Sequence, residues 1–272
     1  MELTLPRTVT LAEHLGPELH GFAGGKAVLF SARAPEKTAP AVNEDAAALI
    51  PLPGQASAGV LVVADGAGGM PAGQEASRTA VQILIDQLQT VHELSALREA
   101  ILDAIEVANE AVRRLGNGSA TTLAVVELVG RTARTYHVGD SPILVFGQRG
   151  RLKLQIVPHS PVGYALESGF LGEEEAVAHE DRYLVSNLLG SPDMRIEIGP
   201  VLELAAKDTL VIASDGLSDN FYVDEIAQHV RKGPLQRQAQ RLADECRTRM
   251  QNPGGDHPSH GDDLTFVLFR RT

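Results

Sequence analysis

The sequence is poor in cysteine, in aromatic residues and in long hydrophobic runs. Cys246 is the single cysteine among 272 residues, which excludes an intrachain disulfide and zinc or iron–sulfur sites built on several cysteines. Tryptophan is absent, and aromatic residues make up 4% of the chain. The apolar run around Val60 to Ala64 is far too short to span a bilayer, and the N-terminal stretch MELTLPRTVTLAEHLG does not resemble a secretion signal. We therefore expect a cytoplasmic protein with no membrane contact.

Positive charge is also scarce, because 24 Lys and Arg stand against 35 Asp and Glu, for a net charge of −11. Binding to nucleic acid requires clustered Lys and Arg, so nucleic acid is not expected as a partner. The hydrophobic fraction of 43% and the charged fraction of 22% are those of an ordinary globular chain. The surplus of acids serves either solubility or the binding of cations, and the positions of the acids have to decide between the two.

The hydrophobic pattern changes its period along the chain. Residues 1–25 show no clear periodicity. Strands are predicted at 27–33, 45–50, 59–66, 209–216 and 264–270, and helices at 74–91, 94–115, 224–231 and 235–250. Four further short strands, at 119–129, 131–139, 141–147 and 151–158, follow one another closely and are predicted to form one antiparallel meander.

The segment from about residue 160 to 195 mixes short helical patterns with Gly and Pro, which predicts an inserted flap subdomain. We see no linker that separates two domains, so residues 1–272 are predicted to form a single domain. Strands and helices occur in separate blocks, which favours the α+β class. Two amphipathic helix pairs need one face each, so we predict an α-β-β-α sandwich of two antiparallel sheets flanked by helix pairs.

Aspartates occur both at the C-terminal ends and at the N-terminal starts of predicted strands. Those that end a strand, each next to a glycine, are Asp65, Asp140 and Asp215. Those that open a strand are Asp45, which follows Glu44, and the pair Asp262 and Asp263. In an antiparallel sheet the C-terminal end of one strand lies beside the start of its neighbour, so these carboxylates are expected to converge on one edge.

Converging carboxylates repel one another unless cations lie between them. Oxygen ligands without cysteine favour Mg²⁺ or Mn²⁺ over zinc. Two such ions, bridged by one carboxylate, lower the pKa of a shared water and stabilise both oxygens of an in-line displacement at phosphorus. A single Asp-Gly pair is more typical of a turn than of a metal site, but the occurrence of acids at both the starts and the ends of strands favours a metal site.

The arrangement of these acidic residues resembles that of the metal-dependent serine/threonine protein phosphatases of the PPM, or type 2C, class. The resemblance covers nearly the whole chain after about residue 25. Its motifs occur in family order: NEDA at 43–46, VVADGAGGMPAGQEAS at 62–77, SATTL at 119–123, HVGDS at 137–141, LVIASDGLSD at 210–219 and GDDLT at 261–265. The family has an α-β-β-α sandwich, in agreement with the layers predicted from the pattern.

The resemblance also implies roles for individual residues. Asp65 would bridge two Mn²⁺ or Mg²⁺ ions, the Gly66 carbonyl would bind one of them, and Asp215 and Asp262 would bind the other. Asp45, and Glu44 through water, would complete the coordination, and Asp140 with Asp215 would support a third, weaker ion. A hydroxide between the ions would attack phosphorus directly, so Asp65 and Asp215 are the predicted catalytic residues.

The sequence departs from the family at the residue that holds the substrate phosphate. The family commonly has an Arg shortly before NED, whereas Pro40, Ala41 and Val42 occupy that stretch here. Arg33 and Lys37 are the candidate replacements, since both carry positive charge, although each is also typical of a solvated surface residue.

Three functions follow from these observations. The first is a signalling phosphatase that removes phosphate from phosphoserine and phosphothreonine in proteins and opposes a Ser/Thr kinase. The second, suggested by the missing Arg, is a weak or inactive regulatory module that binds a phosphoprotein or kinase. The third is a phosphatase for a small phosphoester. The intact set of acids favours the first, because a binding module does not need every metal ligand.

Overall fold

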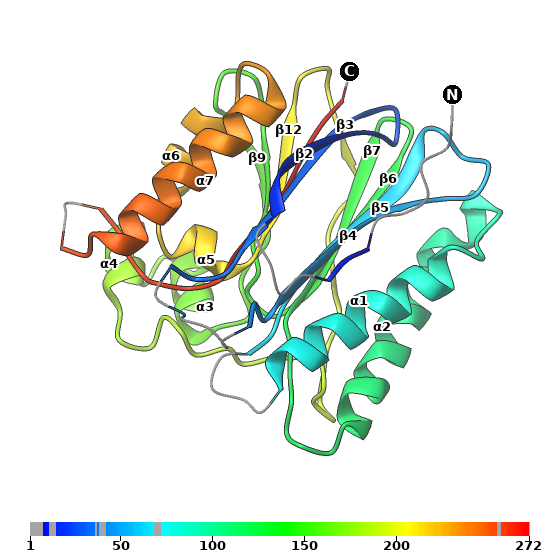
Figure 1. The fold of residues 1–272 in the computed structure, drawn as a ribbon, viewed down its shortest axis with the longest axis horizontal. Coiled ribbons are helices and arrows are strands. Elements are labelled where there is room, and N and C mark those ends of the chain that lie inside the picture. Colours follow the sequence, from blue (N-terminus) through cyan, green and yellow to red (C-terminus); the bar gives the residue numbers. More distant parts are fainter. Residues whose placement is uncertain are drawn as a thin grey trace.

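The computed structural model describes residues 8–10, 15–35, 37, 42–67, 72–254 and 257–271. Two β-sheets lie face to face in the middle of the molecule, and helices cover the outer face of each (Figure 1). Every strand pairing within the two sheets is antiparallel. The predicted α-β-β-α sandwich is therefore confirmed.

The first sheet has seven strands in the order β1-β4-β5-β6-β7-β10, with β11 also paired to β7. Its strands are β1 (Thr8–Thr10), β4 (Asp45–Pro51), β5 (Ala58–Asp65), β6 (Leu123–Val129), β7 (Thr132–Val138), β10 (Glu197–Ile198) and β11 (Leu202–Glu203). β4 and β5 are almost entirely buried because both of their faces are covered, which explains their continuous apolar sequences.

The second sheet has six strands in the order β2-β3-β13-β12-β8-β9. Its strands are β2 (Leu15–Phe22), β3 (Gly25–Ala32), β13 (Leu264–Arg271), β12 (Thr209–Ala213), β8 (Ile143–Phe146) and β9 (Leu152–Gln155). Leu29, Leu61, Val63, Ile212 and Val267 belong to the apolar layer between the two sheets. This layer fixes how the strand ends of one sheet face those of the other.

Helices cover the outer face of each sheet, and η1 (Leu94–Ala96) leads into α2. α1 (Gly73–Leu88) and α2 (Leu97–Arg114) pack their apolar faces on the first sheet. α5 (Asp215–Ser218), α6 (Val223–Val230) and α7 (Leu235–Gln251) pack on the second sheet. The predicted helices at 74–91, 94–115, 224–231 and 235–250 are confirmed to within a few residues.

The predicted meander is wrong in one respect. β6 and β7 belong to the first sheet, whereas β8 and β9 belong to the second. The chain changes sheet at Gly139, whose φ of 100° is a conformation that favours glycine. Asp140 therefore lies where the chain crosses between the sheets.

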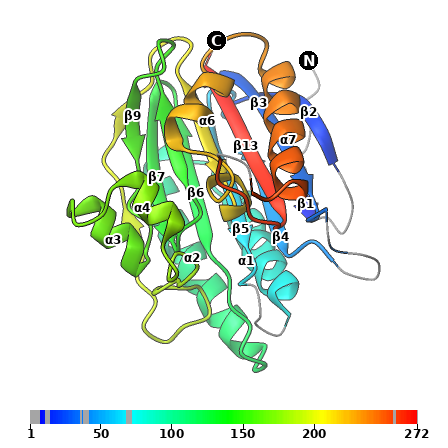
Figure 2. The same ribbon diagram turned by 90° about the vertical axis from the view of Figure 1, so that its left-hand side faces the viewer.

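The segment at 160–195 contains two short helices, α3 (Pro161–Glu167) and α4 (Glu173–Ala178), followed by irregular backbone. In Figure 2 these helices lie to one side of the sandwich, beside α6. We refer to residues 160–195 as the flap. That the flap is an inserted subdomain stays a prediction, as does the single domain over residues 1–272.

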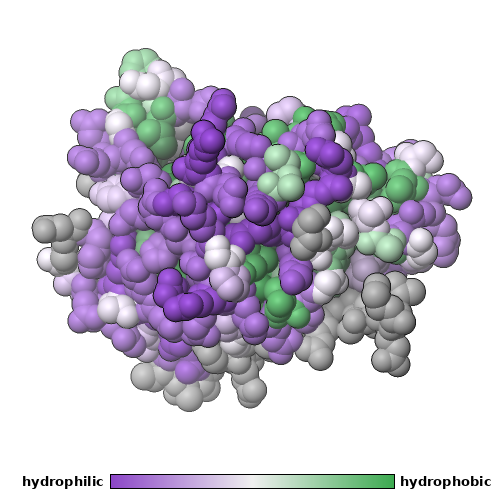
Figure 3. Space-filling view, turned by 90° about the horizontal axis from the view of Figure 1, so that it is seen from above, coloured by the Kyte–Doolittle hydropathy of each residue, from purple (hydrophilic) through white to green (hydrophobic). Residues whose placement is uncertain are grey.

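Two strands near the N-terminus, β1 and β2, escaped the sequence analysis because their residues show no regular alternation. Seen from above, the surface is mostly hydrophilic, with hydrophobic side chains in small separate patches (Figure 3). Within the described part of the chain, no helix has the length and apolar character needed to cross a bilayer.

Candidate metal centre

Asp45 and Asp65 are direct partners across the antiparallel strands β4 and β5. Partners in this register extend their side chains from the same face of the sheet, with Cβ atoms about 4.5–5.5 Å apart. Asp45 is 1% exposed and lies at the start of its strand, while Asp65 ends its own. The first sheet thus brings two of the predicted ligands together by register alone.

The second sheet contributes Asp215 to the same place. The backbone N–H of Asp215 donates to Asp65 Oδ2 at 3.3 Å, and the hydroxyl of Ser214 donates to Asp45 Oδ2 at 2.8 Å. Ser214 and Asp215 follow β12 directly and begin α5. The antiparallel pairing of β12 with β13 places Asp262, just before β13, at the same end of the sheet.

The carboxylates raise one another's pKa. Burial raises the pKa of Asp65 well above its ordinary value, and the charges of Asp215, Asp45, Asp262 and Asp140 raise it further. The pKa of Asp215 is likewise raised by burial and then by the charges of its acidic neighbours. These five acids therefore form one electrostatic cluster, the carboxylate cluster, in which Asp45 is buried and the other four are half-buried.

Asp219 lies beside this cluster and interacts with its member Asp140. Burial raises the pKa of Asp140 to about 7, and the charge of Asp219 adds to this shift. Burial raises the pKa of Asp219 itself to about 6, whereas the charge of Arg182 lowers it. Asp219 escaped the sequence analysis, although its place four residues after Asp215 puts both acids on one side of a single helical turn.

Backbone contacts hold Asp65 and Gly66 in place. The Asp65 carbonyl accepts from the Thr122 N–H at 2.8 Å and from the Thr121 hydroxyl at 2.8 Å. A methyl group at Gly66 would overlap the backbone of Gly73 at the start of α1, so this position requires glycine. The Gly66 N–H donates to the Glu44 carbonyl at 3.1 Å, which ties the end of β5 to the start of β4.

Lys37 and Glu44 make an ion pair beside the cluster. The Lys37 ammonium donates to Glu44 Oε2 at 3.0 Å and to Asp263 Oδ2 at 2.8 Å. Burial lowers the pKa of Lys37, but the hydrogen bonds and charges of Asp263 and Glu44 outweigh burial and raise it overall. Asp263 is 2% exposed and also accepts from the N–H groups of Ala34 and Glu44. In this structure Lys37 therefore neutralises Asp263.

The remaining residues of the predicted site are Arg33 and two stretches of sequence that lie partly outside the described residues. Arg33 directly follows β3 and is half-buried. Its predicted contact with the substrate phosphate, like that of Lys37, stays a prediction. Pro40 and Ala41, and residues 68–71 of the VVADGAGGMPAGQEAS motif, lie outside the described residues.

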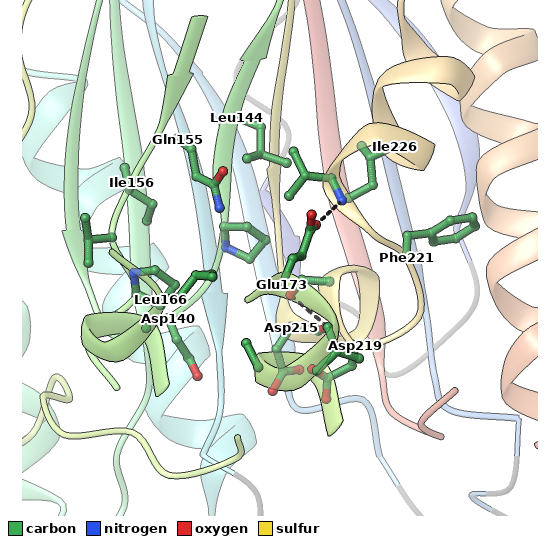
Figure 4. A pocket seen from close by; sticks show the side chains of 18 of the residues that line it. Asp140, Leu144, Gln155, Ile156, Leu166, Glu173, Asp215, Asp219, Phe221 and Ile226 are labelled. Atoms are coloured by element: carbon green, nitrogen blue, oxygen red, sulfur yellow. Dashed lines mark hydrogen bonds between the residues drawn. The ribbon is translucent and has the colours of Figure 1, made fainter. Parts of the chain in front are cut away.

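A cavity of about 680 Å³ opens beside the carboxylate cluster. Asp140, Asp215 and Asp219 line one end of it, and apolar side chains such as Leu144 and Ile226 line the other (Figure 4). Two of the five acids of the carboxylate cluster, Asp140 and Asp215, are wall residues of the cavity, so the cavity reaches the edge of the cluster.

A second group of ligand-type side chains lies nearby. His137, His159 and Glu197 offer ligand atoms within 4.8 Å of one another. The two imidazole rings are stacked, with centroids 4.4 Å apart and planes 24° apart, so their in-plane lone pairs are poorly aimed at one common ion. His159 Nδ1 accepts from the Gly139 N–H at 3.1 Å, and its Nε2 lies 3.1 Å from Glu197. We interpret this group as a support for the backbone that leads to Asp140.

Comparison with known proteins agrees with the geometry. Residues 38–251 match the protein phosphatase 2C family. This chain belongs to that family. It is 34% identical over 179 residues to protein phosphatase PhpP of Streptococcus pneumoniae, a match that spans 61% of this chain and 70% of PhpP. The predicted family, and with it the prediction of a serine/threonine protein phosphatase, is confirmed.

Solved structures show the same fold. The serine/threonine phosphatase of S. agalactiae superposes with a TM-score of 0.77 at 28% identity and covers 90% of this chain and 99% of its own. The catalytic domain of the serine/threonine protein phosphatase PstP, solved in complex with two manganese ions, gives a TM-score of 0.67 at 24% identity. It covers 90% of this chain and 96% of its own.

Proposed function

We propose that this protein hydrolyses phosphoserine and phosphothreonine in proteins and that its carboxylate cluster binds the divalent cations needed for the reaction. The observation that carries the proposal is the convergence of Asp45 and Asp65 from one sheet with Asp215 and Asp262 from the other.

The donor set fits hard divalent cations. The ligand groups are carboxylate and carbonyl oxygens, which suit Mg²⁺ and Mn²⁺ alike. The carboxylates raise one another's pKa, so the cluster is short of positive charge. A phosphate dianion would be repelled by such a cluster, and cations between the two remove that repulsion. The manganese ions of the PstP catalytic domain agree with this class of ion.

Particular residues would hold the ions. Asp65 and the Gly66 carbonyl, together with Asp45, Asp215 and Asp262, would hold two, and Asp140 with Asp215 and Asp219 would hold a weaker third. When bound, the ions supply an acidified water as nucleophile and neutralise charge on the phosphate. The chain's own task is to fix the ligands in place, because preorganised groups need not reorganise during the reaction. Ser214 does this for Asp45, and Thr121 and Thr122 do it for the backbone of Asp65.

The flap contributes a further cation, Arg182. Its charge lowers the pKa of Asp219, and it lines the cavity that also contains Asp140 and Asp215. A guanidinium binds a phosphate through two parallel hydrogen bonds. Arg182 is therefore a third candidate, with Arg33 and Lys37, for the group that holds the substrate phosphate. Replacement of each by Met would identify it, because loss of the phosphate ligand raises KM for a phosphopeptide by at least about tenfold.

The substrate of such an enzyme is a phosphorylated protein, and we expect a Ser/Thr kinase to supply it. The kinase, the choice between Mn²⁺ and Mg²⁺, and the expected cytoplasmic location stay predictions. The deciding experiment measures phosphate release from a phosphothreonine peptide and from p-nitrophenyl phosphate, with Mn²⁺, with Mg²⁺ and with EDTA. We expect turnover with either metal and none with EDTA.

Variants separate catalysis from unspecific effects. Asp65→Asn and Asp215→Asn are expected to lower kcat by at least about a hundredfold. Asp86→Asn provides the matched control, because Asp86 lies on the exposed face of α1 and should leave turnover unchanged. Binding of a phosphopeptide without turnover would instead support the regulatory module. Turnover that Asp65→Asn leaves intact would refute the proposed function.

A further inference from the structure

The cavity beside the carboxylate cluster has two chemically different ends. Figure 4 shows Asp140, Asp215 and Asp219 together at one end, with Leu144 and Ile226 at the other. A phosphate held at the acidic end through cations would leave the adjoining part of its substrate at the mouth of an apolar space.

The apolar end is built by elements that are far apart in sequence. Leu144 and Phe146 of β8 form part of the wall, Ile226 comes from α6, and the flap adds Leu166 from α3 and Val177 from α4. At about 680 Å³ the cavity is much larger than a phosphate group, so hydrolysis of the ester alone does not explain it. Apolar walls gain free energy only when an apolar group displaces water from them.

A contact between the flap and α6 holds one wall in position. Glu173, the first residue of α4, accepts through Oε1 from the Val223 N–H at the start of α6, at 3.0 Å. In Figure 4 the Glu173 side chain reaches across the cavity toward α6. Glu167 and Asp224 also line the cavity, so its charged lining has six carboxylates against one guanidinium, that of Arg182. This excess of negative charge disfavours anionic ligands and acidic peptide segments.

The geometry points to a specificity subsite: the cavity receives a bulky aliphatic side chain of the phosphoprotein, next to the phosphorylated residue. This inference rests on the proposed function and adds to it the class of substrate sequence. The occupant is a peptide segment rather than a free apolar molecule, because the cavity continues directly into the carboxylate cluster through Asp140, Asp215 and Asp219. The excess of acids over arginine in the lining predicts that the flanking segment has neutral or basic residues.

The test uses a set of six phosphothreonine peptides with alanine at the other positions. Each peptide has a single leucine, placed at one of the three positions before or the three positions after the phosphothreonine. An all-alanine peptide is the reference. For the wild-type protein with Mn²⁺, we expect leucine at one or two adjacent positions to raise kcat/KM at least about tenfold. Aspartate at the same position should lower kcat/KM below that of the reference peptide.

Variants locate the effect. Val177→Trp fills the cavity from the half-buried side of α4, and we expect the ratio of kcat/KM between the leucine and alanine peptides to fall to about one. Leu166→Ala removes part of an apolar wall and should lower the ratio independently, which covers a failure of Val177→Trp to fold. Phe170→Trp is the matched control: Phe170 is 85% exposed on the same flap and does not line the cavity, so the ratio should stay as in the wild type.

The failures of the two proposals are distinguishable. Absence of metal-dependent turnover on p-nitrophenyl phosphate and on every peptide would refute the proposed function itself. Turnover with equal kcat/KM for all leucine positions would overturn only the subsite. A leucine preference that survives both Val177→Trp and Leu166→Ala, or that Phe170→Trp abolishes, would place the preference elsewhere and also overturn it.

Discussion

The side chains of Asp45 and Asp65 extend from directly paired positions of β4 and β5, so the fold itself forces a buried acid, Asp45, against a half-buried one, Asp65. Burial raises the pKa of Asp45 to about 7, and the charge of Asp263 contributes to this shift. Without cations, the folded protein must therefore tolerate repulsion that the unfolded chain does not experience. The cluster therefore reduces the stability of the cation-free protein, and the proposed cations would relieve this repulsion.

Asp65→Asn is expected to stabilise the cation-free protein. The amide keeps the shape of the side chain and an oxygen that accepts from the Asp215 N–H, but it removes one charge from the cluster. We expect a gain on the order of 1–2 kcal/mol, or roughly 3–6 °C in Tm, in EDTA at pH 8. Saturating Mn²⁺ should raise the Tm of the wild type and raise that of the variant much less. Equal Mn²⁺-induced shifts in the two proteins would contradict the assignment of Asp65.

The sign of the pH dependence follows from the same repulsion. An acid whose pKa is raised on folding binds more protons in the folded state, so its contribution to stability is lost as the pH rises. For Asp45 and Asp140 the window runs from about 4, the value of an ordinary aspartate, to about 7. The wild type in EDTA should therefore lose stability across this window, and Mn²⁺ should restore it. Thermal melts at half-unit pH steps, with and without the metal, check this.

Lys37 and Asp263 are expected to be strongly coupled. Lys37→Met leaves the buried Asp263 carboxylate without its cation, and we expect a loss of about 2–3 kcal/mol in the free energy of unfolding. Asp263→Asn in the same chain should recover part of this loss, because the charge that needed neutralising is gone. A double-mutant cycle by urea denaturation measures the coupling, which should exceed about 1 kcal/mol. Simple additivity of the two changes would show that Lys37 is a solvated surface charge.

Much of the site could be predicted because strand ends are visible in the sequence. The apolar run before Asp65 and the run after Asp45 mark a strand end and a strand start, and antiparallel pairing then places both acids at one edge. Asp215 and Asp262 follow by the same reasoning on the second sheet. The four layers were predictable because two amphipathic helix pairs need separate faces.

The remaining features depend on tertiary contacts that carry no local signal. The partnership of Lys37 with Asp263 joins residues far apart in the chain. The change of sheet at Gly139 depends on one backbone conformation, and a hairpin pattern on either side does not reveal it. The spacing of four residues between Asp215 and Asp219 does indicate, from the sequence alone, that Asp219 lies on the same side of the helical turn as Asp215.

Asn220 connects the start of α5 to the segment before β13, which carry the predicted ligands Asp215 and Asp262. Its side chain donates to the carbonyls of Gly216 and His260 and accepts from the His260 N–H. Asn220→Ala should therefore lower the free energy of unfolding by about 2–3 kcal/mol, at about 1 kcal/mol for each lost bond. It should also weaken Mn²⁺ binding, measured by calorimetry, at least about threefold, because Asp215 and Asp262 lose their common anchor.

Asn252→Ala is the control for this change, since Asn252 is exposed at the end of α7 and makes one bond to the Thr248 carbonyl. It should leave Mn²⁺ affinity unchanged. If Asn220→Ala lowers stability but binds Mn²⁺ as the wild type does, Asn220 supports the fold and not the metal centre.

His137 is expected to make the protein sensitive to acid. Burial lowers its pKa to about 4, and the neighbouring His159 adds to this shift, so the folded state holds a neutral imidazole. The unfolded chain has an ordinary histidine pKa of about 6.5, so it takes up a proton first as the pH falls. The contribution of His137 to stability is complete above about pH 6.5 and is lost progressively toward pH 4. At pH 4.5 the loss amounts to about 2–3 kcal/mol.

His137→Gln removes this titration and keeps a group that can donate to the Val157 carbonyl. The carboxylates titrate alike in both proteins, so the difference in their free energies of unfolding isolates the histidine. Urea denaturation at pH 7.5 and 4.5 should show that this difference shifts by about 2–3 kcal/mol in favour of the variant at the lower pH. His92→Gln, at an exposed position, should show no such shift. A difference independent of pH would mean that folding does not lower the pKa of His137, and the supporting role assigned to it beside Asp140 would fall.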